Sequence, residues 1–88
     1  MTPKHPDHVV GWNGSLEDLA RSVGNMRYDK VAEFITLLIA EFSAQAEADL
    51  AKGRKDLRAS LKALAETLGE AGVLTRRIWK VCKPYMPS

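Results

Sequence analysis

The feature that most constrains the fold is a long run of helical periodicity divided by a single glycine. Residues 26–52 repeat apolar side chains at helical spacing, Gly53 interrupts the repeat, and residues 54–83 resume it. Pro84 then ends the pattern, because proline lacks a backbone N–H and its ring clashes with the preceding turn. Two long helices joined by a two-residue turn have to run antiparallel. The sequence therefore predicts a helical hairpin.

The N-terminal part of the chain has a different composition. Its first eight residues contain two prolines and both histidines, so we expect residues 1–14 to form a mobile tail. Ser15 is a good N-cap for a short helix that Gly24 should end, and Asn25 should cap the next helix. We therefore expect one all-α domain over residues 15–88, with helices at about 16–23, 26–52 and 54–83.

Each long helix concentrates apolar residues on one face at about 100° per residue. On the second helix this face consists of Tyr28, Val31, Ile35, Leu38, Ile39, Phe42, Ala46 and Leu50. On the third helix it consists of Leu57, Leu61, Leu64, Leu68, Ala71, Thr75, Ile78 and Cys82. We expect these two faces to pack together as the hairpin interface.

The second helix has a further stripe of apolar and small residues on its opposite side. It consists of Phe34, Leu37, Ala40, Ala44 and Ala48. An 88-residue chain builds only a modest core, so surface buried against a partner would add stability. The competing interpretation is that alanine is simply the best helix former on an exposed face. We favour a homodimer with a four-helix-bundle-like core, in which this stripe is the dimer interface.

Two glycines interrupt the strong helical pattern of the third helix. Gly69 and Gly72 should each cost roughly 1 kcal/mol relative to alanine. Close packing of another helix would explain them, and a kink is the alternative.

Charge is divided between the long helices. Residues 28–52 contain five acids and two bases, a net charge of −3, whereas residues 54–83 contain eight bases and three acids, a net charge of +5. Across the hairpin we expect Asp49 and Glu47 near Arg58 and Lys62, and Asp29 near Arg76 or Arg77. Exposed pairs of this kind contribute at most ~1 kcal/mol each and favour correct pairing more than stability.

The bases of the third helix suggest an alternative function. They form a stripe beside Trp79 that is typical of a phosphate-tracking surface, and the first helical turn could bind an anion. The stripe consists of Arg54, Lys55, Arg58, Lys62, Arg76 and Lys80. However, Glu66 interrupts it and the whole chain has a net charge of only +2. A solvated face therefore explains the stripe better, and nucleic-acid binding is the less favoured alternative.

The sequence offers no recognisable catalytic centre. Both histidines lie in the tail, Cys82 is the only cysteine, and there is no phosphate-binding loop, dinucleotide-binding fingerprint or zinc-protease motif. The sequence HPDH at residues 5–8 lacks a fourth ligand, so metal binding there would be adventitious. We expect neither enzymatic activity nor a cofactor or metal, and we expect Cys82 to be a small core residue.

The favoured function is a small non-catalytic interaction module that acts as a homo-oligomer through its helix faces. A cytoplasmic location is expected by default, because no apolar run approaches the roughly 20 residues of a membrane span. The different-class alternative is a small nucleic-acid-binding regulator that uses the basic stripe.

Overall fold

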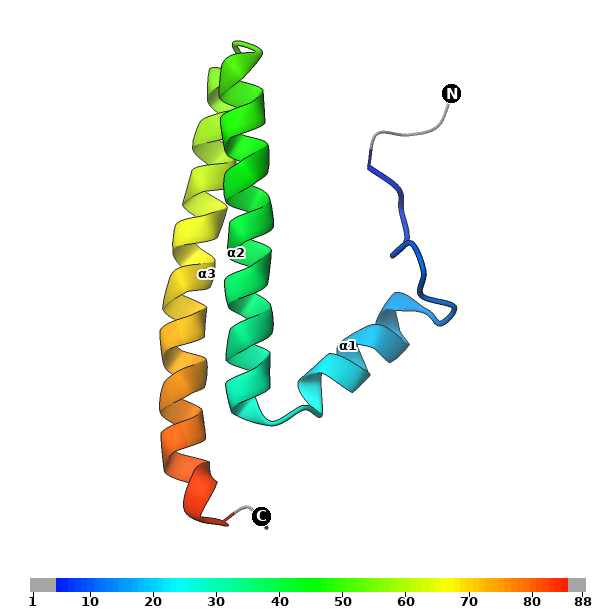
Figure 1. Ribbon diagram of the computed structural model, residues 1–88, viewed down its shortest axis with the longest axis vertical. Coiled ribbons are helices and arrows are strands. Elements are labelled where there is room, and N and C mark those ends of the chain that lie inside the picture. The colour runs from blue at the N-terminus through cyan, green and yellow to red at the C-terminus, as the bar shows by residue number, and fades with distance from the viewer. Residues whose placement is uncertain (1–4, 86–88) are drawn as a thin grey trace.

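The computed structural model describes residues 5–85, and in this range the chain forms helices without strands. The helices are α1 (Leu16–Gly24), α2 (Tyr28–Ala51) and α3 (Lys55–Cys82), followed by a short 3-10 helix, η1 (Lys83–Tyr85). Figure 1 shows α2 and α3 side by side as an antiparallel hairpin, with α1 projecting from the lower end of α2. The all-α fold and the packed helix pair are confirmed. Of the expected tail, residues 1–4 lie outside the described part, and residues 5–15 contain no helix.

The boundaries of α1 follow from capping. Ser15 Oγ accepts a hydrogen bond from the N–H of Asp18 at 3.1 Å, as an N-cap should. The expected role of Asn25 was wrong, because Asn25 closes α1 instead of opening α2. Its N–H donates to the carbonyl of Arg21 at 3.1 Å and its backbone is helical, with φ −91° and ψ −3°, whereas an N-cap is extended. The next helix therefore starts only after Arg27.

A tight turn joins α2 to α3. Gly53 has a φ of +77°, a conformation that glycine adopts without steric cost. Its N–H donates to the carbonyl of Leu50 at 3.0 Å, and the N–H of Arg54 donates to the carbonyl of Asp49 at 2.8 Å. The side chain of Arg54 also pairs with the Asp49 carboxylate at 3.3 Å. These bonds fix the two helices in an antiparallel arrangement.

Small residues form the centre of the contact between α2 and α3. Ala32 and Ala46 are buried on α2, and Ala65 and Gly72 are buried on α3. Within residues 5–85 no large apolar side chain is fully buried. The small side chains let the helices approach closely, and the larger residues lie beside the contact rather than in it.

The hairpin face expected on α3 was therefore partly wrong. Leu57, Leu64 and Ile78 keep 46%, 43% and 47% of their surface exposed, although all three were expected in the hairpin interface. Ala65 and Gly72, which follow Leu64 and Ala71 in the chain, take the central positions instead. The helix is rotated so that its small residues meet α2 and part of its leucine row faces outward.

The two α3 glycines lie in different surroundings, and α3 continues through both. At Gly72 an added Cβ would lie 3.4 Å from Arg76 Nη1 and 3.7 Å from Ile35 Cγ2, which is close but ordinary contact. At Gly69 it would meet nothing within 4 Å. Close packing therefore occurs at Gly72 without requiring glycine, and nothing in the structure explains Gly69.

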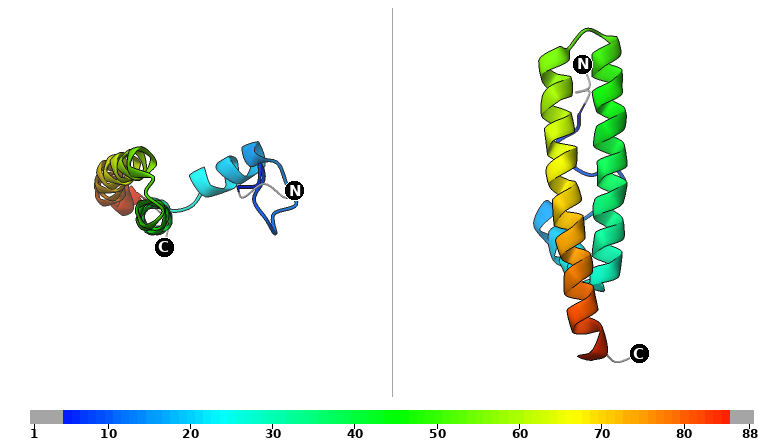
Figure 2. Two further views of the ribbon diagram at one scale, coloured as in Figure 1. Left: turned by 90° about the horizontal axis from the view of Figure 1, so that it is seen from above. Right: turned by 90° about the vertical axis from the view of Figure 1, so that its left-hand side faces the viewer.

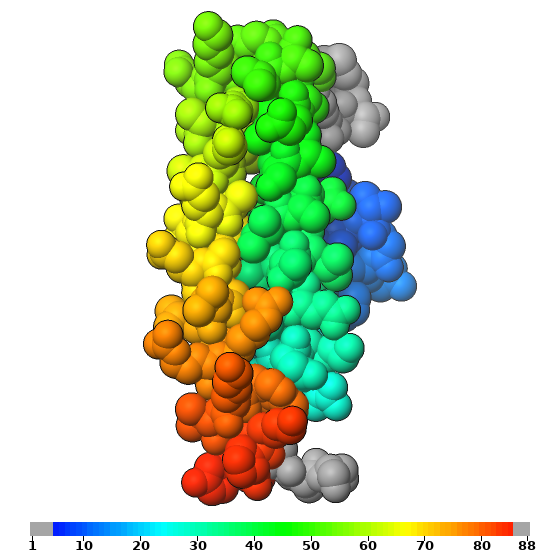
Figure 3. Space-filling view, turned by 60° about the vertical axis from the view of Figure 1, so that its left-hand side comes forward, coloured from blue at the N-terminus to red at the C-terminus, as the bar shows by residue number. Residues whose placement is uncertain are grey.

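The molecule is long and thin. Its principal extents are 49 × 29 × 15 Å, so the hairpin is a single layer of helices. Figure 2 shows α1 pointing away from the hairpin on the α2 side. Figure 3 shows α2 and α3 in contact along their length, with the described N-terminal segment (blue) beyond α2. Most of each helix surface is consequently open to solvent.

Candidate interaction surface

One side of α3 is apolar and free of charge. Between Leu57 and Cys82 every charged side chain of α3 falls on the opposite half of the helix at about 100° per residue. We call the uncharged side the leucine face, which consists of Leu57, Leu61, Leu64, Leu68, Ala71, Leu74 and Ile78. Leu61, Leu68 and Ala71 are half-buried, whereas the other four are exposed. The leucine face is therefore a largely apolar surface that the hairpin leaves mostly uncovered, with the exposed hydroxyl side chains of Ser60 and Thr67 among its leucines.

The hairpin has one polar edge and one apolar edge. On the polar edge, Arg76 Nη2 donates to Thr36 Oγ1 at 3.1 Å, and Lys62 and Glu66 line a hollow of about 340 Å³ with Glu47. The leucine face begins on the other edge, beside a separate hollow that is still polar near the turn: Leu57 and Ala48 line it together with His5, Gln45, Asp49 and Arg54.

On that second edge α2 adds further apolar surface. Ile35, Leu38 and Phe42 fall on the same side of α2 as Gln45 and are half-buried. The apolar surface therefore extends from α3 across the hairpin onto α2.

Helix α1 has an apolar row of its own. Leu16, Leu19, Ala20 and Val23 share one side of α1, and with Phe34 of α2 they line an open hollow of about 510 Å³. Leu16 keeps 60% of its surface exposed. Because α1 makes few contacts with the hairpin, its apolar row is available to another surface.

The stripe expected on the back of α2 is also uncovered. Leu37 is 59% exposed and Phe34 is 38% exposed, and both line a shallow hollow of about 370 Å³. The alanines of the stripe, Ala40, Ala44 and Ala48, are exposed as well. A dimer through this stripe stays a prediction.

The basic residues of α3 have different partners. Arg54 pairs with Asp49, Arg76 bonds to Thr36, and Arg58 is half-buried. The three lysines of the basic stripe, Lys55, Lys62 and Lys80, are exposed. On the same side of the helix, Arg76 and Lys80 also line a hollow of about 460 Å³ with Val73 and Arg77. The expected stripe thus exists, although two of its arginines are already engaged.

Trp79 is not a free stacking platform for bases. Its ring is half-buried, and the guanidinium of Arg27 lies over it at 5.5 Å from the ring centre. This cation–π contact joins the start of α2 to the end of α3. Trp79 therefore connects the two helices at the end of the hairpin opposite the Gly53 turn.

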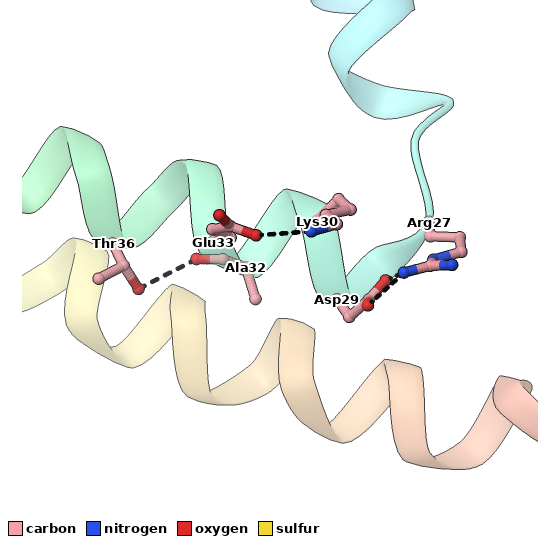
Figure 4. A network of polar contacts seen from close by, with 6 residues as sticks. All are labelled: Arg27, Asp29, Lys30, Ala32, Glu33 and Thr36. Atoms are coloured by element: carbon pink, nitrogen blue, oxygen red, sulfur yellow. Dashed lines mark hydrogen bonds and ion pairs between the residues drawn. The ribbon is translucent and has the colours of Figure 1, made fainter.

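Asp29 has a local partner rather than the expected partner on α3. Arg27 Nε and Nη2 donate to its two carboxylate oxygens at 2.9 and 2.8 Å (Figure 4), so the expected pair with Arg76 or Arg77 was wrong. Arg27 is the residue before α2 and lies two positions before Asp29, so its guanidinium reaches the carboxylate in a bidentate geometry. The side-chain hydrogen bonds from Arg27 lower the pKa of Asp29, and those to Asp29 raise the pKa of Arg27. Lys30 pairs with Glu33 at 3.1 Å one turn further along.

The remaining chemically active side chains are scattered. His8 Nδ1 lies 3.0 Å from Asp7 Oδ1. Across residues 5–85 no three His, Cys, Asp or Glu side chains are grouped closely enough to hold a metal ion. Cys82 is half-buried, and its thiol donates to the carbonyl of Trp79 at 3.7 Å.

In the part of the chain that the structure describes, every helix is too short or too polar to cross a membrane. Comparison with protein-family models, curated proteins and solved structures finds no match for the chain. Its function therefore has to be inferred from the surface itself.

Proposed function

We propose that this protein is a small, non-catalytic helical interaction module that acts as a homo-oligomer. The main support is its excess of exposed surface. The chain of 9.7 kDa exposes 7077 Å². A compact monomer of this mass is expected to expose only ~5,100 Å².

The distribution of mass agrees with this excess. The radius of gyration is 15.9 Å. A compact domain of this length has a radius of gyration of about 12 Å. The difference reflects a hairpin one layer thick and an α1 that stands apart from it.

The exposed surface also contains contiguous apolar patches. Single exposed apolar residues are ordinary on a soluble protein, but a contiguous patch marks an interaction site. The leucine face and the apolar row of α1 form such surfaces on this chain.

Concentration-dependent unfolding tests the proposal. If the native state is an oligomer, mass action makes the melting temperature rise with protein concentration. We expect the midpoint measured by circular dichroism to increase steadily from low to high micromolar concentration. A midpoint that does not change over this range would argue against a homo-oligomer.

A nucleic-acid-binding regulator is the second candidate, supported by the hollow that Arg76, Arg77 and Lys80 line. Phosphate neutralisation makes affinity fall steeply with salt. A gel shift that weakens with salt and is lost in Lys62→Glu and Lys80→Glu would support this candidate. No shift with DNA or RNA at low salt would exclude it.

A further inference from the structure

We infer that the apolar side of the hairpin, formed by the leucine face of α3 and the adjoining side of α2 with Ile35, Leu38 and Phe42, packs against the same side of a second copy of this chain about a two-fold axis. The inference rests on the proposed self-association and specifies the surface and the geometry. It replaces the Leu37 stripe of α2 with the apolar side of α3 as the main dimer contact.

The exposed area is sufficient for such a dimer. The chain exposes roughly 1,900 Å² more than a compact monomer of its mass would. A stable interface of standard size buries about 800 Å² on each partner. The excess, part of which belongs to the α1 that stands apart from the hairpin, is larger than one such interface requires.

The uncharged character of the face restricts what can cover it. A charged group buried against it without a counter-charge would lose its hydration without compensation and would strongly weaken binding. The covering surface therefore has to be apolar and free of charge over a similar length. The same side of a second copy, where the leucine face adjoins Ile35, Leu38 and Phe42 of α2, supplies such an apolar cover, and an interface about a two-fold axis brings a surface against its own copy.

Charge complementarity selects one of the two ways to arrange such a dimer. Helix α2 is acidic, with five acids against Lys30, and α3 is basic, with six bases against three acids. A two-fold axis parallel to the helices places α2 beside the partner's α3, so opposite charges meet at the rim. An axis perpendicular to the helices would place acidic α2 against acidic α2.

The same arrangement provides a place for α1. Helix α1 projects from the lower end of α2, and in this dimer the C-terminal half of the partner's α3 lies beside that end. Leu74 and Val81, which are 53% and 67% exposed, belong to this half of α3. The apolar row of α1 would cover the edge of the partner's α3 there.

A matched pair of α3 variants tests the inference. Leu64 is 43% exposed on the leucine face, and Val73 is 58% exposed on the charged side of the same helix. Leu64→Glu should raise the dimer dissociation constant at least ~100-fold, because it buries a carboxylate in an apolar contact. Val73→Glu and Leu37→Glu should each change it less than ~3-fold, as expected for surface positions. Light scattering measures mass, and circular dichroism measures helicity in the same samples.

A charge-pairing experiment separates loss of the interface from loss of folding. About a two-fold axis parallel to the helices, both copies of residue 64 lie at the same height in the core. Leu64→Glu and Leu64→Lys chains should each be monomeric alone and should form a dimer when mixed. Failure of the mixture to dimerise would overturn the inferred geometry even if both variants lose helicity.

The remaining outcomes have distinct consequences. A wild-type chain that is monomeric at every concentration would overturn both the proposed function and this inference. A Leu64→Glu chain that remains dimeric would overturn the inference alone. If Leu37→Glu dissociates the dimer and Leu64→Glu does not, the interface lies on the back of α2 instead. Equal dissociation by Leu64→Glu and Val73→Glu would also contradict a specific leucine face.

Discussion

Arg27 links several parts of the hairpin through one side chain. Its guanidinium forms bidentate hydrogen bonds with Asp29 at 2.8 and 2.9 Å and lies 5.5 Å from the centre of the Trp79 ring. The sequence predicted neither contact, because it indicated opposite charges on the two helices but not the reach of a residue just outside α2. Asp29 pairs with Arg27 rather than with a base of α3 because the backbone already holds Arg27 and Asp29 close together.

The Arg27–Asp29 pair predicts a measurable pH response. The hydrogen bonds from Arg27 hold the pKa of Asp29 below its ordinary value of 3.8. A lowered pKa in the folded state adds stability above the pKa of the unfolded chain, and this contribution is lost as the pH falls through the folded-state pKa. Arg27→Gln should raise the pKa of Asp29 toward 3.8 in an NMR titration. If the pKa of Asp29 is as low in Arg27→Gln as in the control Arg21→Gln, the pairing is refuted.

Glycine at position 69 provides a second test at the residue scale. Alanine is favoured over glycine in a helix by about 1 kcal/mol, and a Cβ at Gly69 would meet nothing within 4 Å. Gly69→Ala should therefore raise the free energy of unfolding by up to ~1 kcal/mol in urea denaturation. A loss of stability would reveal a close contact at Gly69 that the isolated chain does not contain.

At the scale of the elements, start and stop signals were more informative than faces. Ser15, Gly53 and Pro84 predicted where the helices begin and end to within about two residues, because caps and breakers act locally. The contact face of α3 was harder to predict. Ala65 and Gly72 contribute little to a hydrophobic pattern, yet they occupy the centre of the contact because close approach favours small side chains. Periodicity identifies the apolar half of a helix without showing which part of it the neighbouring helix covers.

Helix α1 provides the prediction at this scale. If its apolar row covers the partner's α3, Leu16→Glu should raise the dimer dissociation constant about 10-fold or more, since a carboxylate would enter an apolar contact. The helicity of the chain should be almost unchanged, because Leu16 is 60% exposed in the single chain. Ser22→Glu, on the polar side of α1, is the matched control. If sedimentation velocity gives the same dimer dissociation constant for Leu16→Glu and Ser22→Glu, α1 lies outside the interface.

At the scale of the whole molecule, the single chain is a thin layer without a core of large side chains among residues 5–85. Its buried residues in the hairpin are alanines, a glycine and, near the turn, Asp49, whereas leucines remain half open to solvent. The sequence predicted an incomplete core from chain length and a second apolar surface from the width of the apolar belt. It placed that surface on α2, because the leucines of α3 were assigned to the hairpin. The rotation of α3 makes those leucines available instead.

The molecular mass of the wild-type chain in solution tests self-association most directly. Sedimentation equilibrium over a series of micromolar concentrations determines this mass independently of shape. We expect the weight-average mass to approach twice the 9.7 kDa of the single chain as concentration rises. A mass that stays at 9.7 kDa throughout the series would contradict self-association and, with it, the pairing of leucine faces.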